Sequence, residues 1–459
     1  MTGTEYSGKK VLVVGAARSG VAAAEFLLAR GATVVLTDCR RLEELPASVG
    51  RLRGGVAGNR LLLELGGHRA ASFRECDLVV TSPGVPLSIG FFTESRSAGV
   101  PIIAEVELAY RHIKGRILGI TGSNGKTTTT ELVAEMLRAG GLHGHAAGNV
   151  GVPLISFVAE STAEDFYATE LSSFQLEGIE RFRPAVATIL NLTPDHLDRY
   201  AGFEEYAAAK RRIFMNQKPG DFAVLNLDDP LVAAIAVELQ STAVFFSRQG
   251  QPQRGTYVDS GRVLHRDGAS EKELFLVDDI TLRGEHNLEN VLAAATVSLL
   301  AGVPAEGLCD AVRRFKGVEH RLEWVAEING VHYFNDSKAT NVDATIKAIR
   351  AFPGGIHLIA GGRDKGADFS TLRDLVRDRV RELVLIGEAA ETIERALAGQ
   401  TDIRRAASLE EAVHVCRRHA LPGEIVLLAP ACASYDMFTN YEHRGRVFKE
   451  SVLALTHGS

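Results

Sequence analysis

The residues best suited to chemistry are Lys126 and Thr127, which end a short turn containing two glycines. The apolar run 117–120 before the turn is typical of a strand, and residues 131–139 after it are typical of an amphipathic helix. Glycines let backbone N–H groups approach phosphate oxygens, and the N-terminus of the helix adds partial positive charge. A lysine there supplies charge for the β- and γ-phosphates, and the adjacent hydroxyl holds Mg²⁺. The spacing therefore predicts an ATP site.

The match to the standard P-loop is incomplete. Ile120 stands where the first glycine is usual, so that only Gly122 and Gly125 precede the lysine. The alternative is an ordinary strand–turn–helix connection without a ligand, but the surrounding strand and helix are the context that the motif demands. The residues expected to hold the nucleotide phosphates are Gly122, Ser123, Asn124, Gly125, Lys126, Thr127 and Thr128.

Three further polar segments follow apolar runs. They contain Asn149, Glu170 and residues 191–198, which include His196. In a parallel sheet such segments emerge at the carboxyl edge of the strands, where ligands bind. A lone histidine is usually structural or a surface group, but its place after a strand and opposite a P-loop favours metal or phosphate binding.

A second glycine-containing turn lies near the N-terminus. Residues 15–20 follow the first apolar run, and Asp38 ends the second. This pattern resembles a dinucleotide fingerprint in which Ala17 replaces the middle glycine. An NAD site and a nucleotide-diphosphate site of related geometry explain it equally well, and the turn at 81–86 offers further backbone donors. Both turns also occur as ordinary connections without a ligand.

Composition narrows the class of protein. The 459 residues are 46% hydrophobic and 24% charged, as in soluble globular proteins. A net charge of −6 argues against a dedicated nucleic-acid surface. No apolar run is long enough to span a bilayer, and the polar residues 1–10 predict no signal peptide. Five scattered cysteines indicate reduced thiols, so we expect a cytoplasmic protein.

Strand-like and helical patterns alternate almost throughout, which predicts the α/β class with parallel sheets. The expected strands include residues 186–192, 222–226 and 425–428. We expect three domains: a Rossmann-like domain at 1–104, a central P-loop ATPase-like domain at 105–317, and a Rossmann-like C-terminal domain at 318–459. Residues 248–279 are expected to be rich in strands. A helix that begins near His286 is expected to close the central domain.

Seven segments together carry a resemblance to a known family. They are residues 121–127, 170–175, 195–198, 284–287, 320–321, 335–341 and 430–434. With these segments in this order the chain resembles the Mur ligases, ATP-dependent amide ligases of peptidoglycan precursor synthesis. The resemblance covers essentially the whole chain. It is greatest to the branch that joins D-glutamate to UDP-N-acetylmuramoyl-L-alanine through an acyl phosphate, with release of ADP and phosphate.

The resemblance implies catalytic and metal-binding roles that composition alone does not. The catalytic residues it implies are Lys126, Glu170, His196, Lys210 and Arg321. The ligands it implies for two Mg²⁺ ions are Thr127, Glu170, His196 and Lys210. It also implies that Lys210 is carbamylated, which turns a cation into an acidic group. On composition alone Lys210 is a solvated lysine on a helix.

The resemblance further implies three groups of binding residues. The adenine, ribose and phosphates are expected to contact Asn287, Asn290, Arg321 and Asp336. The incoming amino acid is expected to contact Lys338, Thr340, Lys365, Ser434 and Tyr441. The UDP-linked substrate is expected to contact Ser19, Arg40, Gly84, Asn149 and His196. Tyr435 and Tyr441 stand where relatives often have Leu and Phe. Cys39, next to Arg40, also differs from the family pattern, so the fine substrate specificity stays open.

Other interpretations compete with this one. A folate polyglutamylating enzyme, or a Mur ligase for another amino acid, would share the P-loop and the Mg²⁺ ligands. Neither would combine segment 430–434 with a UDP-type N-terminal domain. A non-catalytic nucleotide-binding module or an NAD dehydrogenase would leave Glu170, His196 and Lys338 unexplained. The expected partners are small molecules, with no nucleic acid and no membrane, and the expected state is a monomer.

Overall fold

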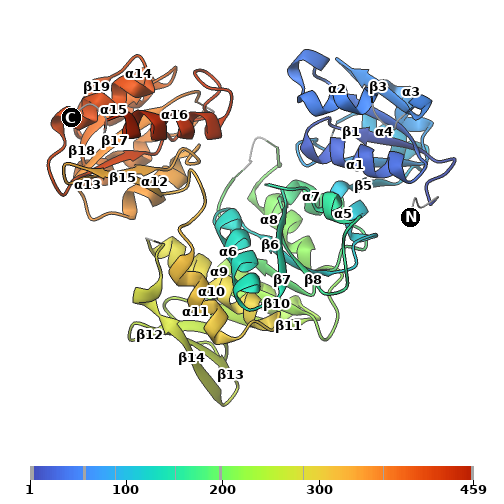
Figure 1. Ribbon diagram of the computed structural model, residues 1–459, viewed down its shortest axis with the longest axis horizontal. Coiled ribbons are helices and arrows are strands. Elements are labelled where there is room, and N and C mark those ends of the chain that lie inside the picture. The colour runs from blue at the N-terminus through green and yellow to red at the C-terminus, as the bar shows by residue number, and fades with distance from the viewer. Residues whose placement is uncertain are drawn as a thin grey trace. The chain divides into compact units, whose positions relative to one another are not determined.

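A computed structural model describes residues 5–54, 58–87, 89–149, 151–195, 199–282, 284–364 and 366–455. It contains three sheets, coloured blue, green to yellow, and orange to red in Figure 1, and confirms the predicted α/β class with three domains. The chain forms two compact units. The first unit comprises Met1–Asp279 and Glu289–Arg314, and the second comprises Ile280–Leu288 and Phe315–Ser459.

The N-terminal sheet has five parallel strands in the order β3-β2-β1-β4-β5. The strands are β1 Lys10–Val14, β2 Thr33–Asp38, β3 Leu61–Leu65, β4 Leu78–Thr81 and β5 Ile102–Ala104. Successive side chains of a strand point to opposite faces. Val11 and Val13 accordingly pack in the core with helix α1 (Arg18–Ala29), while Leu12 and Val14 pack in a second core. Because both faces are covered, the strands read as unbroken apolar runs.

The central sheet has nine strands in the order β14-β13-β12-β11-β10-β9-β6-β8-β7. The strands are β6 Arg116–Thr121, β7 His143–Gly148, β8 Asp165–Glu170, β9 Val186–Ile189, β10 Phe222–Asn226, β11 Thr242–Ser247, β12 Arg254–Asp259, β13 Arg262–Asp267 and β14 Ser270–Leu276. All neighbours are parallel except β12, β13 and β14, which form an antiparallel extension. This extension confirms the strand-rich region expected at 248–279.

Two elements of the central sheet differ from the sequence-based expectation. Helix α6 is Lys126–Ala139, so it begins five residues before the expected 131. Its first turn is rich in threonine, a weak helix former, and the amphipathic pattern therefore becomes visible only later. The apolar run expected as a strand over 186–192 ends as a strand at Ile189. Beyond that residue the Leu190 N–H still bonds the Thr121 carbonyl, but the Leu192 N–H turns to the Asp229 carboxylate.

The C-terminal sheet has six strands in the order β15-β16-β20-β17-β18-β19, with only β15 antiparallel to its neighbour. The strands are β15 Glu323–Ile328, β16 Val331–Asn335, β17 Ile356–Gly361, β18 Val380–Ile386, β19 Asp402–Arg405 and β20 Ile425–Leu428. Leu358 and Ile359 illustrate the alternation, since each is buried in a different core. This layering is Rossmann-like, as predicted.

The remaining helices connect these strands. In the first unit they include α2 Ala47–Gly54, α3 Ala70–Arg74, α4 Phe91–Ser97, α5 Glu105–Tyr110, α7 Ser173–Glu177, α8 Phe203–Arg211, α9 Pro230–Ala233 and α11 Ala305–Arg314. Helix α10, Glu285–Leu300, begins where a helix was expected. The second unit contains α12 Val342–Arg350, α13 Arg373–Arg379, α14 Ala390–Leu397, α15 Leu409–His419 and α16 Tyr441–Ala454. None of the helices in the described ranges has the length and hydropathy needed to cross a bilayer.

A charged cluster joins the amino ends of three strands of the C-terminal sheet. His357 of β17 is buried, and its two ring nitrogens lie 3.1 Å from Glu382 of β18 and 2.9 Å from Glu424, which precedes β20. Both nitrogens can donate to carboxylates only if the ring is an imidazolium. Burial would lower the pKa of His357, but these two hydrogen bonds outweigh burial and raise it. Arg404 and His419 also contact Glu382, and Arg381 contacts Glu424.

This cluster makes the stability of the C-terminal sheet depend on pH. Because the pKa of His357 is raised in the folded state, its contribution is complete below the ordinary value of 6.5 and is lost as the pH rises through the raised pKa. We expect His357→Gln to lower the free energy of unfolding by about 1.5–3 kcal/mol at pH 6 and by much less at pH 9. Trp324 in β15 is the only tryptophan, so its fluorescence during denaturation follows this sheet.

The control for this experiment is His332→Gln in the same sheet, because His332 is 40% exposed and lies 3.7 Å from Glu327. It should change stability little at either pH. A His357→Gln deficit of the same size at pH 6 and pH 9 would contradict a charged ring.

Candidate active site

The turn between β6 and α6 is built around a glycine that no other residue can replace without strain. Gly125 has φ +86°, in the region that disfavours side chains. A Cβ added there would lie 2.1 Å from Oδ1 of Asn290, a buried residue of α10. The turn and this asparagine are therefore packed directly together. Lys126 and Thr127 open α6 immediately afterwards, as a P-loop requires.

Side chains from the loop after β9 hold the turn in place. The Asn124 N–H donates to Oδ1 of Asn191 (2.8 Å), and the Asn191 side-chain amide donates back to the Asn124 carbonyl (3.2 Å). Ser123 Oγ accepts from the Thr193 N–H and the Tyr206 hydroxyl and donates to the Thr193 carbonyl. Neither Asn191 nor Tyr206 was among the expected site residues. The one available signal was the position of Asn191 near the end of an apolar run.

Two lysines converge on the carbonyls of the same turn. Lys126 Nζ donates to the carbonyls of Gly122 and Ser123 at 2.9 Å each, and Lys210 Nζ donates to the Gly122 carbonyl at 2.9 Å. Lys210 lies on α8, is only 2% exposed, and has its Nζ 4.7 Å from the centre of the Tyr206 ring. Its interpretation as a solvated lysine is therefore wrong.

The surroundings of Lys210 favour its neutral amine. Burial lowers the pKa of Lys210 well below its ordinary value, and the nearby charge of Lys126 lowers it further. Asp195 and Glu170 act in the opposite direction, but more weakly. A buried amine that is neutral is a nucleophile, whereas an ammonium is not.

Glu170 has the character of a cation ligand. It ends β8 and is 2% exposed, and its Oε1 accepts from the side-chain amide of Asn149 at 3.1 Å. Its Oε2 is buried and has no hydrogen-bond partner among the residues that the structure describes. Leaving a carboxylate oxygen in that state is costly unless a cation binds it. Together with the Thr127 hydroxyl at the start of α6, this donor set fits Mg²⁺.

The N-terminal sheet has its own candidate site where the strand order reverses, between β1 and β4. Asp38 Oδ2 accepts from the Ala16 N–H (2.8 Å), and Arg40 donates to both carboxylate oxygens (2.8 and 3.0 Å). Burial alone would raise the pKa of Asp38, but these hydrogen bonds lower it to about 2. Ser19 is half-buried and Gly84 is exposed on the two turns at this edge.

A third group of expected site residues lies on turns of the C-terminal sheet. Lys338 Nζ is 5.8 Å from the centre of the Tyr441 ring, and Ser434 is 2% exposed. Asp336 follows β16 and is buried. Burial raises the pKa of Asp336 to about 6, although the charges of Arg321 and Lys338 oppose the rise. Thr340 is half-buried on the turn after Lys338.

Arg444 braces these turns and was not anticipated from the sequence. Its side chain is fully buried on α16 and donates to Oγ and the carbonyl of Ser337 (3.0 and 2.9 Å) and to the Cys432 carbonyl (3.2 Å). It thereby links the turn that carries Lys338 to the turn that carries Ser434. Burial lowers the pKa of Arg444 to about 10, so it remains charged at neutral pH. The only sequence signal was that Arg444 lies three residues after Tyr441, an expected site residue on the same helix.

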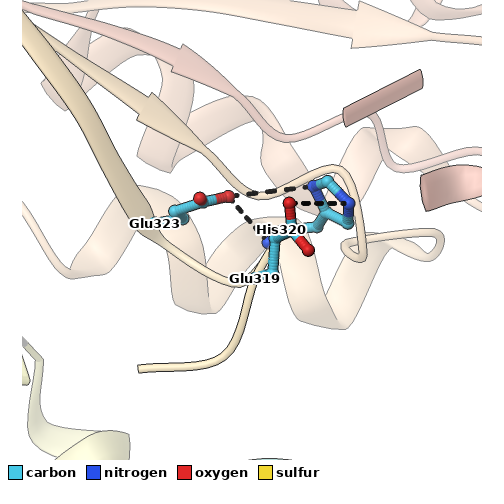
Figure 2. Close-up of side chains that lie close together, drawn as sticks. All are labelled: Glu319, His320 and Glu323. Atoms are coloured by element: carbon cyan, nitrogen blue, oxygen red, sulfur yellow. Dashed lines mark hydrogen bonds and ion pairs between the residues drawn. The ribbon is translucent and has the colours of Figure 1, made fainter. Parts of the chain in front are cut away.

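A compact cluster supports the turn that carries Arg321. Figure 2 shows Glu319, His320 and Glu323 close together. The Glu323 carboxylate accepts a hydrogen bond of 2.9 Å from the backbone N–H of His320. Lys449 lies 2.9 Å from Glu319 and 2.5 Å from Glu323. Because this lysine supplies the positive charge that a metal ion would bring, we interpret the cluster as an ion-pair network.

Asn287 and His286 lie in the segment that belongs to the second unit, whereas Asn290 belongs to the first. Asn287 is buried. Burial, reinforced by the charges of Arg321 and Lys347, lowers the pKa of His286 to about 4, so the ring is neutral at pH 7. This histidine was not among the expected site residues, although it stands beside one.

The structure therefore places the expected residues in three groups, one at the carboxyl edge of each sheet. The P-loop residues, Asn149, Glu170, Lys210 and Asn290 belong to the central group. His196 and Lys365 lie outside the described residues.

Three family models match the chain in succession. The Mur ligase MurD-like N-terminal domain matches residues 9–104, the Mur ligase middle domain matches 120–298, and the Mur ligase glutamate ligase domain matches 320–432. Among solved structures, UDP-N-acetylmuramate–alanine ligase from Thermotoga maritima is 18% identical with a TM-score of 0.61, covering 97% of this chain and 100% of its own. The pseudomurein peptide ligase type C from Methanothermus fervidus is 17% identical with a TM-score of 0.60, covering 97% and 100%. These two structures share the fold.

Curated relatives are far more similar in sequence. UDP-N-acetylmuramoylalanine–D-glutamate ligase from Acidobacterium capsulatum is 51% identical over 98% of this chain and 97% of its own length. The enzyme of the same name from Koribacter versatilis is 48% identical over 98% of both chains. Identity at this level extends through all three sheets and confirms the resemblance carried by the seven segments. The chain therefore belongs to the Mur ligase family.

Proposed function

We propose that this protein is an ATP-dependent ligase that joins D-glutamate to UDP-N-acetylmuramoyl-L-alanine in peptidoglycan precursor synthesis, with release of ADP and phosphate. The identity of 51% along nearly the whole chain to a relative of that name carries the choice of substrates. The alternative of an NAD dehydrogenase is set aside, because membership of the ligase family accounts for the same N-terminal turn.

The first chemical step makes the carboxylate reactive. A carboxylate does not condense with an amine at neutral pH, because hydroxide is a poor leaving group. Transfer of the ATP γ-phosphoryl group to the alanine carboxylate gives an acyl phosphate and ADP. Such a transfer depends on positioning and on neutralising charge, the roles we assign to Lys126 and Arg321. Bound Mg²⁺ would supply further positive charge to the phosphates.

The second step forms the amide. The amine of D-glutamate attacks the acyl carbon, a C–N bond forms through a tetrahedral species, and the C–O bond to phosphate breaks. The amine loses a proton to solvent, and phosphate leaves with the bonding electrons. We assign the amino-acid pocket to Lys338, Thr340, Lys365, Ser434 and Tyr441. The cations of Lys338 and Lys365 and the hydroxyls of Thr340 and Ser434 suit a substrate with two carboxylates.

We assign two Mg²⁺ ions to Thr127, Glu170, His196 and a carbamylated Lys210. The buried, orphaned Oε2 of Glu170 supports a cation at this place. The environment of Lys210 supports the carbamate, because a neutral amine adds CO₂ and releases one proton. The product is an anion beside Lys126, so the carbamate is attracted to the same ammonium that disfavours a protonated Lys210.

The other binding roles are assigned from the resemblance to the family. Asn287, Asn290, Arg321 and Asp336 are assigned to the nucleotide, and Ser19, Arg40, Gly84, Asn149 and His196 to the UDP-linked substrate. The domain bounds we propose are 1–104, 105–317 and 318–459. The end of β5 at Ala104 supports the first bound. We also propose a cytoplasmic monomer that binds neither nucleic acid nor membrane.

The proposed activity is tested by phosphate release. The purified protein, supplied with ATP, Mg²⁺ and UDP-N-acetylmuramoyl-L-alanine, is screened against single amino acids. We expect release that depends on D-glutamate, with a product heavier than the substrate by one glutamyl residue. Phosphate release with diaminopimelate or L-alanine in place of D-glutamate would assign the chain to another branch of the family. Phosphate release with a folate in place of UDP-N-acetylmuramoyl-L-alanine would contradict the proposed UDP-linked substrate.

Amino-acid affinity is expected to depend on Lys338. A charge-assisted contact is worth roughly 1.5–3 kcal/mol, so Lys338→Ala should raise the KM for D-glutamate by about one to two orders of magnitude. The KM for ATP should change far less. Initial rates measured over a range of each substrate separate the two constants. Lys365→Ala is expected to behave in the same way.

The matched control is Lys272→Ala, which removes one exposed lysine from β14. It should leave both KM values unchanged. An unchanged KM for D-glutamate in Lys338→Ala would place the amino-acid pocket elsewhere.

A further inference from the structure

The edge of the central sheet opposite the P-loop carries a cavity of about 410 Å³. It lies at the amino ends of β6 and β9, whereas the P-loop follows the carboxyl end of β6. Arg116 is the first residue of β6 and lines the cavity, while Thr121 is the last and precedes the P-loop. The cavity is therefore separate from the site proposed for ATP. Its volume is within the range of small-molecule sites.

The cavity is lined by four arginines and by no acidic side chain among the described residues. Two of these arginines are fixed by carboxylates that do not line the cavity. Arg111 contacts Glu107 (2.8 Å) and Glu180 (2.7 Å), and Arg183 makes two hydrogen bonds to Asp221 (2.7 and 3.0 Å). Paired guanidinium groups are held in one orientation, which lowers the entropic cost of binding a further anion.

The other two arginines bring charge that is not neutralised. Arg116 and Arg181 are exposed and have no ion pair within the part of the chain that the structure describes. The guanidinium of Arg116 lies 5.4 Å from the centre of the Phe166 ring, which orients it without neutralising it. Tyr110 adds a hydroxyl, and burial raises its pKa, so it remains a hydrogen-bond donor. Guanidinium groups of this kind match the oxygens of phosphates and carboxylates.

We propose that this cavity binds a small multivalent anion that carries phosphate or carboxylate groups. Arg116 and Arg181 supply the attraction, and Arg111 and Arg183 supply preoriented donors. The inference does not rest on the proposed ligase activity, because it uses only the residues of this cavity.

The experiment is calorimetric titration of the full-length Lys126→Ala protein at low salt with pyrophosphate and, separately, with citrate. The Lys126→Ala background weakens binding at the P-loop, so the remaining binding reports on the cavity. The test variant adds Arg116→Gln and Arg181→Gln. The control variant adds Arg51→Gln and Arg69→Gln, which remove the same charge from exposed positions of the N-terminal domain.

We expect at least one probe to bind the background protein with a stoichiometry of one. The test pair should weaken that binding by about tenfold per arginine, or ~100-fold in all, while the control pair changes it less than about twofold. Binding of pyrophosphate alone would identify a phosphate-bearing ligand, and binding of citrate alone a polycarboxylate. Lack of binding by both probes, or equal weakening by the two pairs, would overturn the proposal. Thermal unfolding of both variants verifies that they fold.

Discussion

Lys126→Ala is expected to reduce ligase turnover to below about 1% of the wild-type rate, because loss of one preorganised electrostatic donor alone costs about 10²–10³-fold. Its ammonium donates to the carbonyls of Gly122 and Ser123 in the turn that we assign to the phosphates, so we expect it to contribute charge rather than packing of the core. Phosphate release with saturating substrates measures the effect. The unfolding temperature should remain close to that of the wild type.

Two comparisons make this result specific. Lys272→Ala removes an exposed lysine from β14 and should retain full activity. Binding of a fluorescent ATP analogue should be lost by Lys126→Ala and retained by the control. Phosphate release at the wild-type rate by Lys126→Ala would refute the assignment of the ATP site.

Lys210→Ala is expected to be nearly inactive and to regain part of its activity when short carboxylic acids are added. Truncation leaves space beside Tyr206, and a small carboxylate can enter it and replace the negative group of a carbamate. Activity should rise with the concentration of acetate or formate and then saturate. Activity also should fall when the wild-type enzyme is assayed in buffers freed of CO₂.

The control for rescue is the Lys126→Ala protein, which the same acids should not restore, because that position needs a cation. Wild-type activity should also be unaffected by the acids. Full activity of Lys210→Ala without any acid would show that neither the ammonium nor a carbamate at this position takes part in turnover.

The parts of the fold that were predictable are those in which sequence pattern and burial agree. β10 and β20 are apolar runs buried on both faces, and both were expected at the residues where they occur. The strands that the sequence pattern did not predict are mainly edge strands. β7 contains two glycines and two histidines, and β19 is mostly charged, so neither has the apolar pattern of a buried strand. Charged edges discourage pairing with other chains and thereby conceal the strand from pattern analysis.

The site shows the same division. Lys126 and Thr127 were predictable because a phosphate-binding turn needs particular residue types at a fixed spacing. The role of Lys210 could be inferred only from the family resemblance, because nothing in the local sequence pattern shows that this helix residue is buried. Arg444 lies more than 100 residues from Ser337, which it holds, so only the folded chain brings the two together.

The tight fit at Gly125 also bears on how resistance to an inhibitor aimed at this turn could arise. Every single-nucleotide missense change in a glycine codon introduces a residue with a Cβ, and here that atom would meet Asn290 at a backbone angle that side chains rarely adopt. An escape mutation would therefore strain the same turn that we assign to the phosphates. A compound that rests against Gly125 would face a surface with few viable genetic alternatives, which favours this short turn as a target for inhibitor design.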